Sequence, residues 1–138
     1  MIDGGEVQMT HYQLVALYTV PCAVILFILA ANCIRLRVRH KVGLGHMGNN
    51  VLELAMRAHA NAAEHIPIVL IMLVLLAALQ ASVIFIHAAG ICLVAGRALH
   101  AIAFSRNPGT TPGRFFGQFL TFTAYLIAVV GLIIALLK

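Results

Sequence analysis

The chain has 138 residues, of which 62% are hydrophobic and only 9% are charged, whereas about a quarter of the residues in a soluble globular domain are charged. This composition excludes a soluble domain and predicts an all-α integral membrane protein, a single-domain bundle of four transmembrane helices covering residues 1–138. The formal net charge of +5 is not accompanied by a recognisable nucleic-acid-binding module, so we expect no nucleic-acid partner.

The first predicted helix covers approximately residues 12–33, a stretch without a formal charge. Its length is sufficient for a hydrocarbon core that needs about 20 residues. Asp3 and Glu6 precede it without any lysine or arginine, whereas a secretory signal begins with a positive region, so we expect a retained membrane anchor. The segment from Ile34 to about Val51 is expected to be an irregular basic connection.

The second predicted helix must include polar residues. Its purely apolar part, residues 66–79, is only fourteen residues long, which is too short to span a bilayer comfortably. We therefore place the helix at approximately residues 55–80, so that the segment MRAHANAAEHIP lies at or inside the membrane boundary. Helical periodicity puts four polar side chains on one helix face, those of Glu53, Arg57, Asn61 and Glu64. His65 borders this face.

The third and fourth helices are predicted at approximately residues 82–104 and 115–137. The third is interrupted by Arg97, which shares a helix face with His100 and Phe104. The segment SRNPGTTPG between the two helices has two prolines and two glycines in nine residues, a composition that predicts a turn.

The basic residues predict the topology. Most of them lie in or beside the first and third connections, which by the positive-inside bias face the cytoplasm and leave both termini on the other side. They also predict contact with anionic membrane lipid. The three cysteines show no metal-ligand spacing, so we expect no metal site. The compact chain is typical of a bacterial inner membrane protein, although an organelle membrane fits the same physics.

Charges inside the predicted membrane segments are candidates for function. Glu64 lies about 10 Å inward of Arg57 along a helix, and Arg97 lies nine residues inward of Arg106. Glu64 and Arg97 are therefore expected at similar depths, where they can pair within a subunit or between subunits. Each such charge costs about 2.5–3.5 kcal/mol near a helix centre, so it is a functional candidate by default. A purely structural polar cluster is the alternative.

Arginine is present in excess on the predicted cytoplasmic half. One Glu–Arg pair would account for Glu64, and Glu53 is the only other acidic residue near it. The basic residues that converge there are Arg57, Arg97, Arg106 and Arg114. Because guanidinium groups bind carboxylates through two parallel hydrogen bonds, this surplus indicates an anionic ligand.

Three motifs in this order resemble the MAPEG family, the membrane-associated proteins of eicosanoid and glutathione metabolism. RAHANAAEHIP, residues 57–67, resembles the helix 2 signature R-x-x-x-N-x-x-E-x-x-P of that family. GRALHAIAF, residues 96–104, resembles the helix 3 segment of its microsomal prostaglandin E synthases. Arg114 follows at about the spacing of the family's helix 4 arginine. The resemblance covers essentially the whole chain.

The resemblance implies a homotrimer that binds glutathione, its co-substrate, in a cleft between subunits near the cytoplasmic face. It implies that Arg114 lies near the sulfur as the catalytic residue, with Arg106 as the alternative. Arg97 is implied to pair with Glu64 as well as to contribute to the site. One of Arg35, Arg37 and Arg39 takes the place of the family's helix 1 arginine. The implied glutathione-binding residues are Arg57, Asn61, Glu64, His65, Arg97, His100 and Arg37.

The implied chemistry needs no nucleophile from the protein. An arginine beside the sulfur lowers the pKa of a thiol from about 8.5 and raises the fraction of thiolate, which is the nucleophile. A lipophilic electrophile or lipid hydroperoxide would enter from the lipid. Several family enzymes have tyrosine at the positions of His65, His100 and Phe104, and the turn before Arg114 is about one residue longer here. These departures concern catalysis more than binding.

Two further classes of function fit the sequence. The first is a non-catalytic family member that binds a lipid or a partner, as the five-lipoxygenase-activating protein does. The second is a proton-coupled transporter that uses its histidines and Glu64 as a relay. Another low-molecular-weight thiol or an anionic lipid headgroup would also fit the site in place of glutathione.

Overall fold

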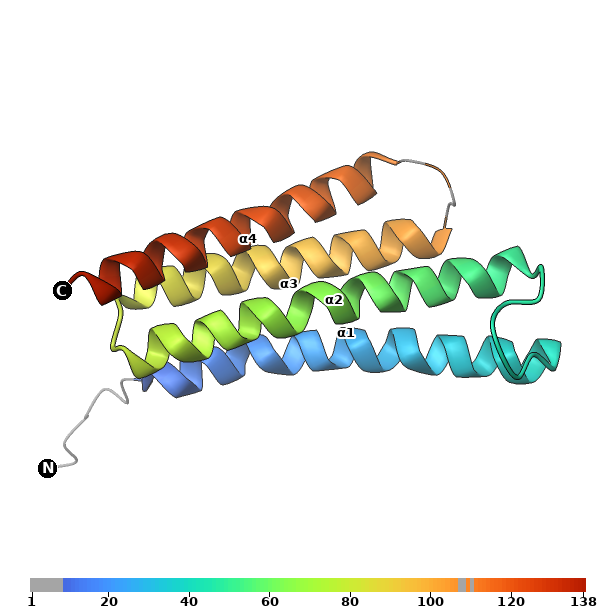
Figure 1. Ribbon diagram of the computed structural model, residues 1–138, viewed down its shortest axis with the longest axis horizontal. Helices are drawn as coiled ribbons and strands as arrows, with labels where there is room; N and C mark the ends of the chain where they lie inside the picture. The colour runs from blue at the N-terminus through green and yellow to red at the C-terminus, as the bar shows by residue number, and fades with distance from the viewer. Residues whose placement is uncertain (1–8, 107–108, 110) are drawn as a thin grey trace, which may run out of the picture.

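A computed structural model describes residues 9–106, 109 and 111–138, apart from the side chains of Ser105 and Arg106. Each of its four helices is long and apolar enough to cross a membrane. The predicted all-α class with four transmembrane helices is confirmed. The helices run antiparallel in chain order (Figure 1) and are α1 (His11–His40), α2 (Asn50–Ala78), α3 (Val83–Arg106) and α4 (Pro112–Leu136).

The first helix ends later than expected. α1 continues to His40 instead of ending near residue 33, so the predicted irregular connection is wrong from Ile34 to His40. Basic side chains in the last turn favour the helix because they lie near the negative end of its dipole. Lys41 ends it in a left-handed conformation, φ 54°, and donates its backbone N–H to the carbonyls of Arg37 and Val38. Capping, and not the first charged residue, sets this boundary.

Capping also places the beginnings of α2 and α4 earlier than predicted. Asn49 precedes α2, and its side chain accepts a hydrogen bond from the backbone N–H of Leu52. Thr111 precedes α4, accepts a hydrogen bond from the backbone N–H of Arg114, and is followed by Pro112 in the first turn. These residue types are strongly preferred at helix beginnings. Arg114 therefore lies in the first turn of α4, next to the end of α3.

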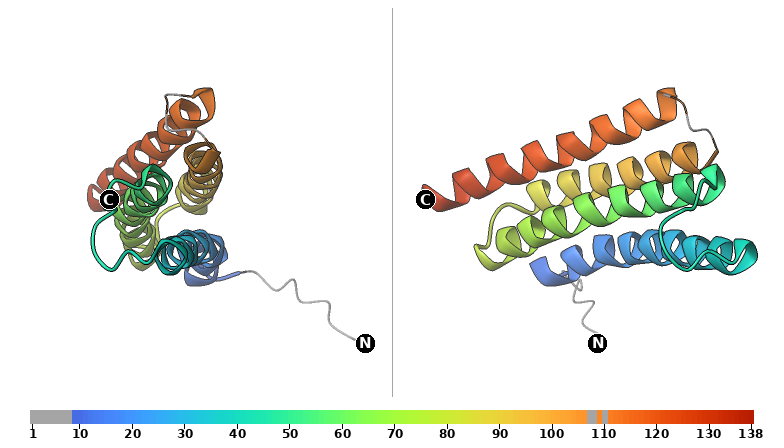
Figure 2. Two further views of the ribbon diagram at one scale, coloured as in Figure 1. Left: turned by 90° about the vertical axis from the view of Figure 1, so that its right-hand side faces the viewer. Right: turned by 45° about the vertical axis from the view of Figure 1, so that its right-hand side comes forward.

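The bundle is open on one side. α2 and α3 lie in the middle, α1 packs on both of them, and α4 packs on α3 and α2, whereas α1 and α4 make no contact within the described residues (Figure 2). Part of the surface of α1 and of α4 therefore faces outward. Side chains on these outward faces are apolar, as in Phe27 and Phe119.

Two glycines bring α3 and α4 unusually close together. A Cβ atom on Gly117 would lie 2.7 Å from the backbone nitrogen of His100, and one on Gly96 would lie 2.9 Å from the carbonyl oxygen of Gly117. Any side chain at either position would therefore push the helices apart. Arg97 follows Gly96 on α3, so this close approach brings its side chain against the backbone of α4.

The two longer connections lie at one end of the bundle. Figure 1 shows the α1–α2 and α3–α4 connections at this end, and the beginning of α1, the α2–α3 turn and the end of α4 at the other. This arrangement is the one required by the predicted topology, and the assignment of the first end to the cytoplasm stays a prediction. The expectations for Asp3 and Glu6, and for most of the turn after α3, lie outside the described residues.

Candidate functional site

A pocket of about 210 Å³ lies between α2, α3 and the first turn of α4. Five residues singled out by the sequence line it, together with the small Ala60 and the aromatic Phe104. Its full lining is Arg57, Ala60, Asn61, Glu64, His100, Phe104 and Arg114. The structure thus brings together, from three helices, most of the predicted site.

The α2 wall follows directly from helical spacing. Arg57, Asn61 and Glu64 are separated by four and three residues, so their side chains lie on one face. Arg57 and Glu64 are exposed in the single chain, and Asn61 is half-buried. Ala60 leaves room between them because its side chain is only a methyl group. This wall offers one cation, one amide and one anion to a ligand.

Arg97 lies behind this wall and does not line the pocket. Its side chain is 1% exposed, and neutral oxygens surround its guanidinium group. Nε donates to Thr121 Oγ1 at 2.7 Å, Nη1 donates to Asn61 Oδ1 at 2.7 Å, and Nη2 donates to Gln118 Oε1 at 3.2 Å and to the Gly117 carbonyl at 3.3 Å. Three of these four acceptors belong to α4, which the close glycine contact brings within reach.

The expected pairing of Glu64 with Arg97 is wrong within one chain. Glu64 faces the pocket and is exposed, while Arg97 is satisfied by Asn61 and α4. Within the described part of the chain, the only acid–base contact is between His46 Nδ1 and Glu53 Oε2, at 3.8 Å. Glu53, in the first turn of α2, therefore contacts the α1–α2 connection and does not line the pocket.

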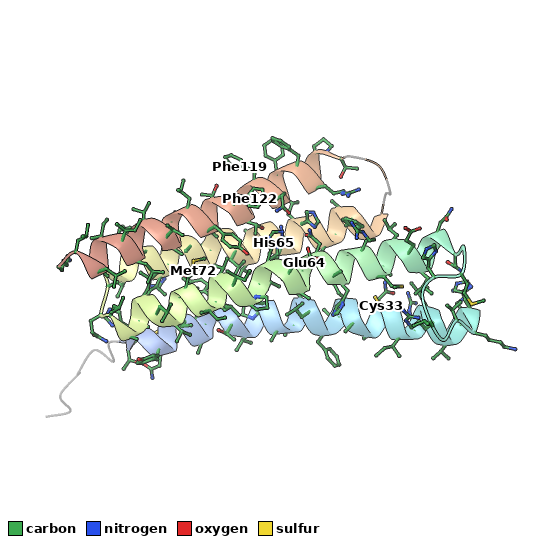
Figure 3. The ribbon with its side chains drawn as sticks, in the orientation of Figure 1. Cys33, Glu64, His65, Met72, Phe119 and Phe122 are labelled. Carbon is green, nitrogen blue, oxygen red and sulfur yellow. The ribbon has the colours of Figure 1, made fainter. Side chains whose placement is uncertain are left out.

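His65 is turned away from the pocket, although it follows Glu64 directly. Figure 3 shows both residues on α2, with Phe119 and Phe122 on the neighbouring α4. The His65 ring meets the rings of Phe122 and Tyr125 edge-on, each at a centroid distance of 5.9 Å. Its Nε2 is 3.2 Å from the Gln118 amide nitrogen. His65 thus contributes to the interface between α2 and α4.

The aromatic ring of Phe104, where several family enzymes have tyrosine, holds Arg114 beside the pocket. The guanidinium carbon lies 4.0 Å from the centre of the Phe104 ring, a distance at which a cation is attracted to the ring face. Nη1 of Arg114 also donates to the carbonyl of Gly109 at 2.7 Å. The His100 and Phe104 rings lie 5.5 Å apart. Because His100 and Phe104 are four residues apart on α3, helical spacing places both rings on the same side of the pocket.

Arg37, the candidate from the first helix, lies away from the pocket in the single chain. Arg37 donates to the carbonyls of Val42, Gly43 and Gly45 and to the Met56 sulfur, so it holds the α1–α2 connection. A place for Arg37 in the site would require another subunit. The side chain of Arg106 lies outside the described residues, whereas Arg114 lines the pocket.

A second hollow adjoins the first. It has a volume of about 280 Å³ and is lined by His100, Thr111, Arg114 and Phe115. His100 and Arg114 belong to both hollows. Arg114 thus lies between a strongly polar pocket and a more apolar one that borders the outward face of α4.

Comparison with known proteins agrees with this arrangement of helices. The model of the MAPEG family matches residues 15–134, which is most of the chain. The chain belongs to the MAPEG family. The resemblance noted in the sequence is thereby confirmed, and its four-helix membrane bundle is the fold found here.

Two individual proteins that are similar to this chain carry the same name. The chain is 36% identical over 89 residues to "Inner membrane protein YecN" of Escherichia coli strain K12, a match that covers 64% of this chain and 68% of the relative. The protein of that name in the O6:H1 strain of Escherichia coli matches to the same extent. The relatives and the four spans support an integral inner membrane protein.

Proposed function

We propose that this MAPEG protein binds glutathione in the pocket between α2, α3 and α4 and uses it as a co-substrate against lipophilic electrophiles or lipid hydroperoxides. The observation that carries the proposal is the convergence of five residues from three helices on one pocket. They are Arg57, Asn61, Glu64, His100 and Arg114. These are also positions at which the motifs of the chain resemble the family's glutathione-binding residues.

The charges of the pocket match those of glutathione. The tripeptide carries two carboxylates, one ammonium group and a thiol. Arg57 and Arg114 provide two cations at the pocket wall, and Glu64 provides an anion for the ammonium group. Arg97 adds a third positive charge behind Asn61. In a partly dry site such charge-assisted contacts are stronger than in water.

Arg114 has the position that thiol activation needs. Its guanidinium group lies between the polar and the apolar hollow, so a thiol bound there would meet a positive charge on one side and the apolar substrate on the other. The charge favours the thiolate. The thiolate sulfur attacks the electrophilic carbon and forms the S–C bond, while the leaving group departs with the electron pair of the bond that breaks. With a hydroperoxide, the sulfur takes the distal oxygen as the O–O bond breaks, which gives glutathione sulfenic acid and, after protonation, an alcohol. The thiol of a second glutathione then displaces the sulfenic oxygen as water and forms the disulfide.

A homotrimer belongs to the same proposal. Arg57 and Glu64 are exposed in the single chain, yet both lie on a helix long enough to span the membrane. Lipid contact with a charged side chain costs about 2.5–3.5 kcal/mol near the centre of a span and less toward its ends. Neighbouring subunits would cover these residues and could supply an α1 arginine. The site is proposed to lie near the cytoplasmic face.

Calorimetric titration of the detergent-purified protein with glutathione tests this function. We expect saturable binding accompanied by ultraviolet thiolate absorbance, and loss of both in Arg57→Ala. Size-exclusion chromatography with light scattering provides the control that the variant keeps its fold and oligomeric state. A folded oligomer that binds no glutathione would contradict the proposal.

One observation favours a second candidate function, a non-catalytic binder of an anionic lipid headgroup. Phe104 has no hydroxyl to offer a thiol, and the guanidinium group of Arg114 is engaged by the Phe104 ring and by Gly109. In this alternative the pocket binds a phosphate or carboxylate without chemistry. Glutathione binding without turnover of any electrophile in a broad panel would favour it.

A further inference from the structure

We propose that Arg97 is a positioning residue that orients the side-chain amide of Asn61, so that the NH₂ group faces the pocket and selects a ligand oxygen. The inference deepens the proposed function, on which it rests only for the identity of the ligand. The partner group would be a carboxylate or a peptide carbonyl. Arg97 itself would touch no ligand.

The orientation follows from the chemistry of the guanidinium group. The oxygen and nitrogen of an asparagine amide are similar in shape, and their assignment depends on the hydrogen bonds around them. A guanidinium group has only donors, so it can be paired only with an oxygen. Arg97 Nη1 lies 2.7 Å from the Asn61 side chain and is therefore bound to Oδ1. The Nδ2 group must point the other way.

Burial and the other hydrogen bonds of Arg97 keep its Nη1 group bound to Asn61 Oδ1. Arg97 as a residue is 1% exposed, so water cannot replace Asn61 as an acceptor. Three of its other four N–H donors are taken by Thr121, Gln118 and the carbonyl of Gly117. Asn61 lines the pocket, whereas Arg97 does not. Because the oxygen of Asn61 binds the buried arginine, Asn61 presents its NH₂ group as a hydrogen-bond donor at the pocket wall.

The same reasoning orients a second amide, on the side away from the pocket. Arg97 binds Gln118 Oε1 at 3.2 Å, so the Gln118 NH₂ group donates to His65 Nε2, also at 3.2 Å. That ring nitrogen must then be the unprotonated one, and His65 carries its hydrogen on Nδ1, where the Tyr125 hydroxyl lies 3.4 Å away. One arginine therefore fixes two amides, of which only Asn61 reaches the pocket.

A fixed donor at this place has a consequence for selectivity. A ligand oxygen would accept from Asn61, whereas an N–H group there would leave two donors facing each other. An unsatisfied buried polar group lowers affinity by about 5- to 150-fold, and by more when it is charged. The site should therefore discriminate strongly against a ligand that lacks the oxygen.

Two matched substitutions separate orientation from charge. Asn61→Asp and Gln118→Glu each add one negative charge beside Arg97, and each leaves it an oxygen to bind. Only Asn61→Asp also replaces the NH₂ group at the pocket by an oxygen. We expect Asn61→Asp to weaken glutathione binding by on the order of 100-fold, and Gln118→Glu to change the dissociation constant by less than about threefold, as for a residue outside the pocket.

Either of two binding results would overturn the inference. Equal weakening by both substitutions would mean that neutralising Arg97, and not the orientation of Asn61, determines affinity. Unchanged affinity in Asn61→Asp would mean that the amide does not face the ligand. Because Arg97 keeps a partner in both variants, we expect both to fold, and thermal unfolding in the same detergent checks this.

A ligand-free measurement keeps the inference separate from the proposed function. Solid-state NMR of the protein in bilayers, with ¹³C-labelled asparagine and ¹⁵N-labelled arginine, should show dipolar coupling between the Asn61 carbonyl carbon and the Arg97 guanidinium. Asn61→Asp identifies this signal, and the exposed pair of Arg35 Nη2 and Asn32 Oδ1, 2.8 Å apart, gives a reference coupling. No coupling at Asn61 would overturn the inference. Coupling without glutathione binding would contradict only the proposed function.

Discussion

The two ends of the bundle satisfy their polar groups in different ways. At the end with the α2–α3 turn, the Tyr18 hydroxyl lies 2.6 Å from His87 Nδ1, and His11 Nε2 donates to the carbonyl of Ala81 at 3.0 Å. These contacts join α1 to α3 and to the turn, and neither involves a carboxylate or a guanidinium group. Toward the other end, Arg97 is buried among neutral oxygens, while Arg57 and Glu64 face a pocket.

The difference distinguishes polar groups that fasten helices from polar groups that serve a ligand. The Tyr18 ring lies directly on Gly90 of α3, so its hydrogen bond to His87 is part of a close helix contact. The pocket instead gathers two arginines and one glutamate from two helices, Arg57 and Glu64 of α2 and Arg114 of α4. Charges of one sign that converge on a hollow are costly in a membrane unless something of opposite charge binds there. Substitutions at the two ends should therefore affect different properties.

The largest effect is expected for Arg97→Met. This substitution leaves the oxygens of Asn61 and Gln118 without their buried donor, and each unsatisfied buried acceptor typically costs about 1–3 kcal/mol. We expect a corresponding loss in the free energy of unfolding, measured by denaturation of the purified protein with sodium dodecyl sulfate. A variant as stable as the wild type would mean that Arg97 does not hold α4.

The second largest effect is expected for Arg114→Ala, which should slow the chemical step more than it weakens glutathione binding. Removing the positive charge beside the sulfur should lower kcat on the order of 100-fold, similar to the loss of one preorganised charge-stabilising group. The dissociation constant of glutathione should rise only modestly. Stopped-flow kinetics with a model electrophile and calorimetry measure the two quantities, and equal losses in both would exclude a specific role at the sulfur.

Gly90→Ala tests the end of the bundle with the α2–α3 turn, where the polar contacts involve no carboxylate or guanidinium group. The added methyl group would overlap with the Tyr18 ring, and overpacking of this kind costs about 1–3 kcal/mol. We expect lower stability but an unchanged dissociation constant for glutathione at temperatures where the variant is folded. Weaker glutathione binding by a folded Gly90→Ala protein would show that the two ends are coupled.

The smallest expected effect belongs to Phe104→Leu. It removes the aromatic face under Arg114, and such cation–π contacts contribute about 0.5–2 kcal/mol. Turnover should fall by several-fold up to about 30-fold, and Phe104→Tyr should retain activity because its ring keeps the contact. If leucine and tyrosine behave alike, the ring does not position Arg114.

The sequence predicted the family, the number of helices and five residues of the pocket because motifs, apolar stretches and helical faces are all local features of the chain. Arg57, Asn61 and Glu64 share a face in any helix, whatever packs against it. The helix ends were missed because Asn49, Thr111 and Lys41 act through backbone geometry that charge patterns do not report.

Contacts that depend on the distance between helices could not be predicted. The approach of Gly96 and Gly117 decides that Arg97 binds α4, and this was not visible in the spacing of α3 alone. His65 and Glu64 are neighbours in sequence, but a helix turns about 100° per residue, so they face different partners. The position of Arg37 likewise depends on how the α1–α2 connection folds over it.

The most direct test of the account is an experimental structure of the protein determined in the presence of glutathione. The account predicts ligand density in the pocket, with an oxygen of the tripeptide beside Asn61, the ammonium group near Glu64 and the sulfur on the side of Arg114. Density at another site, or an unchanged pocket at a concentration that saturates the calorimetric signal, would contradict the account.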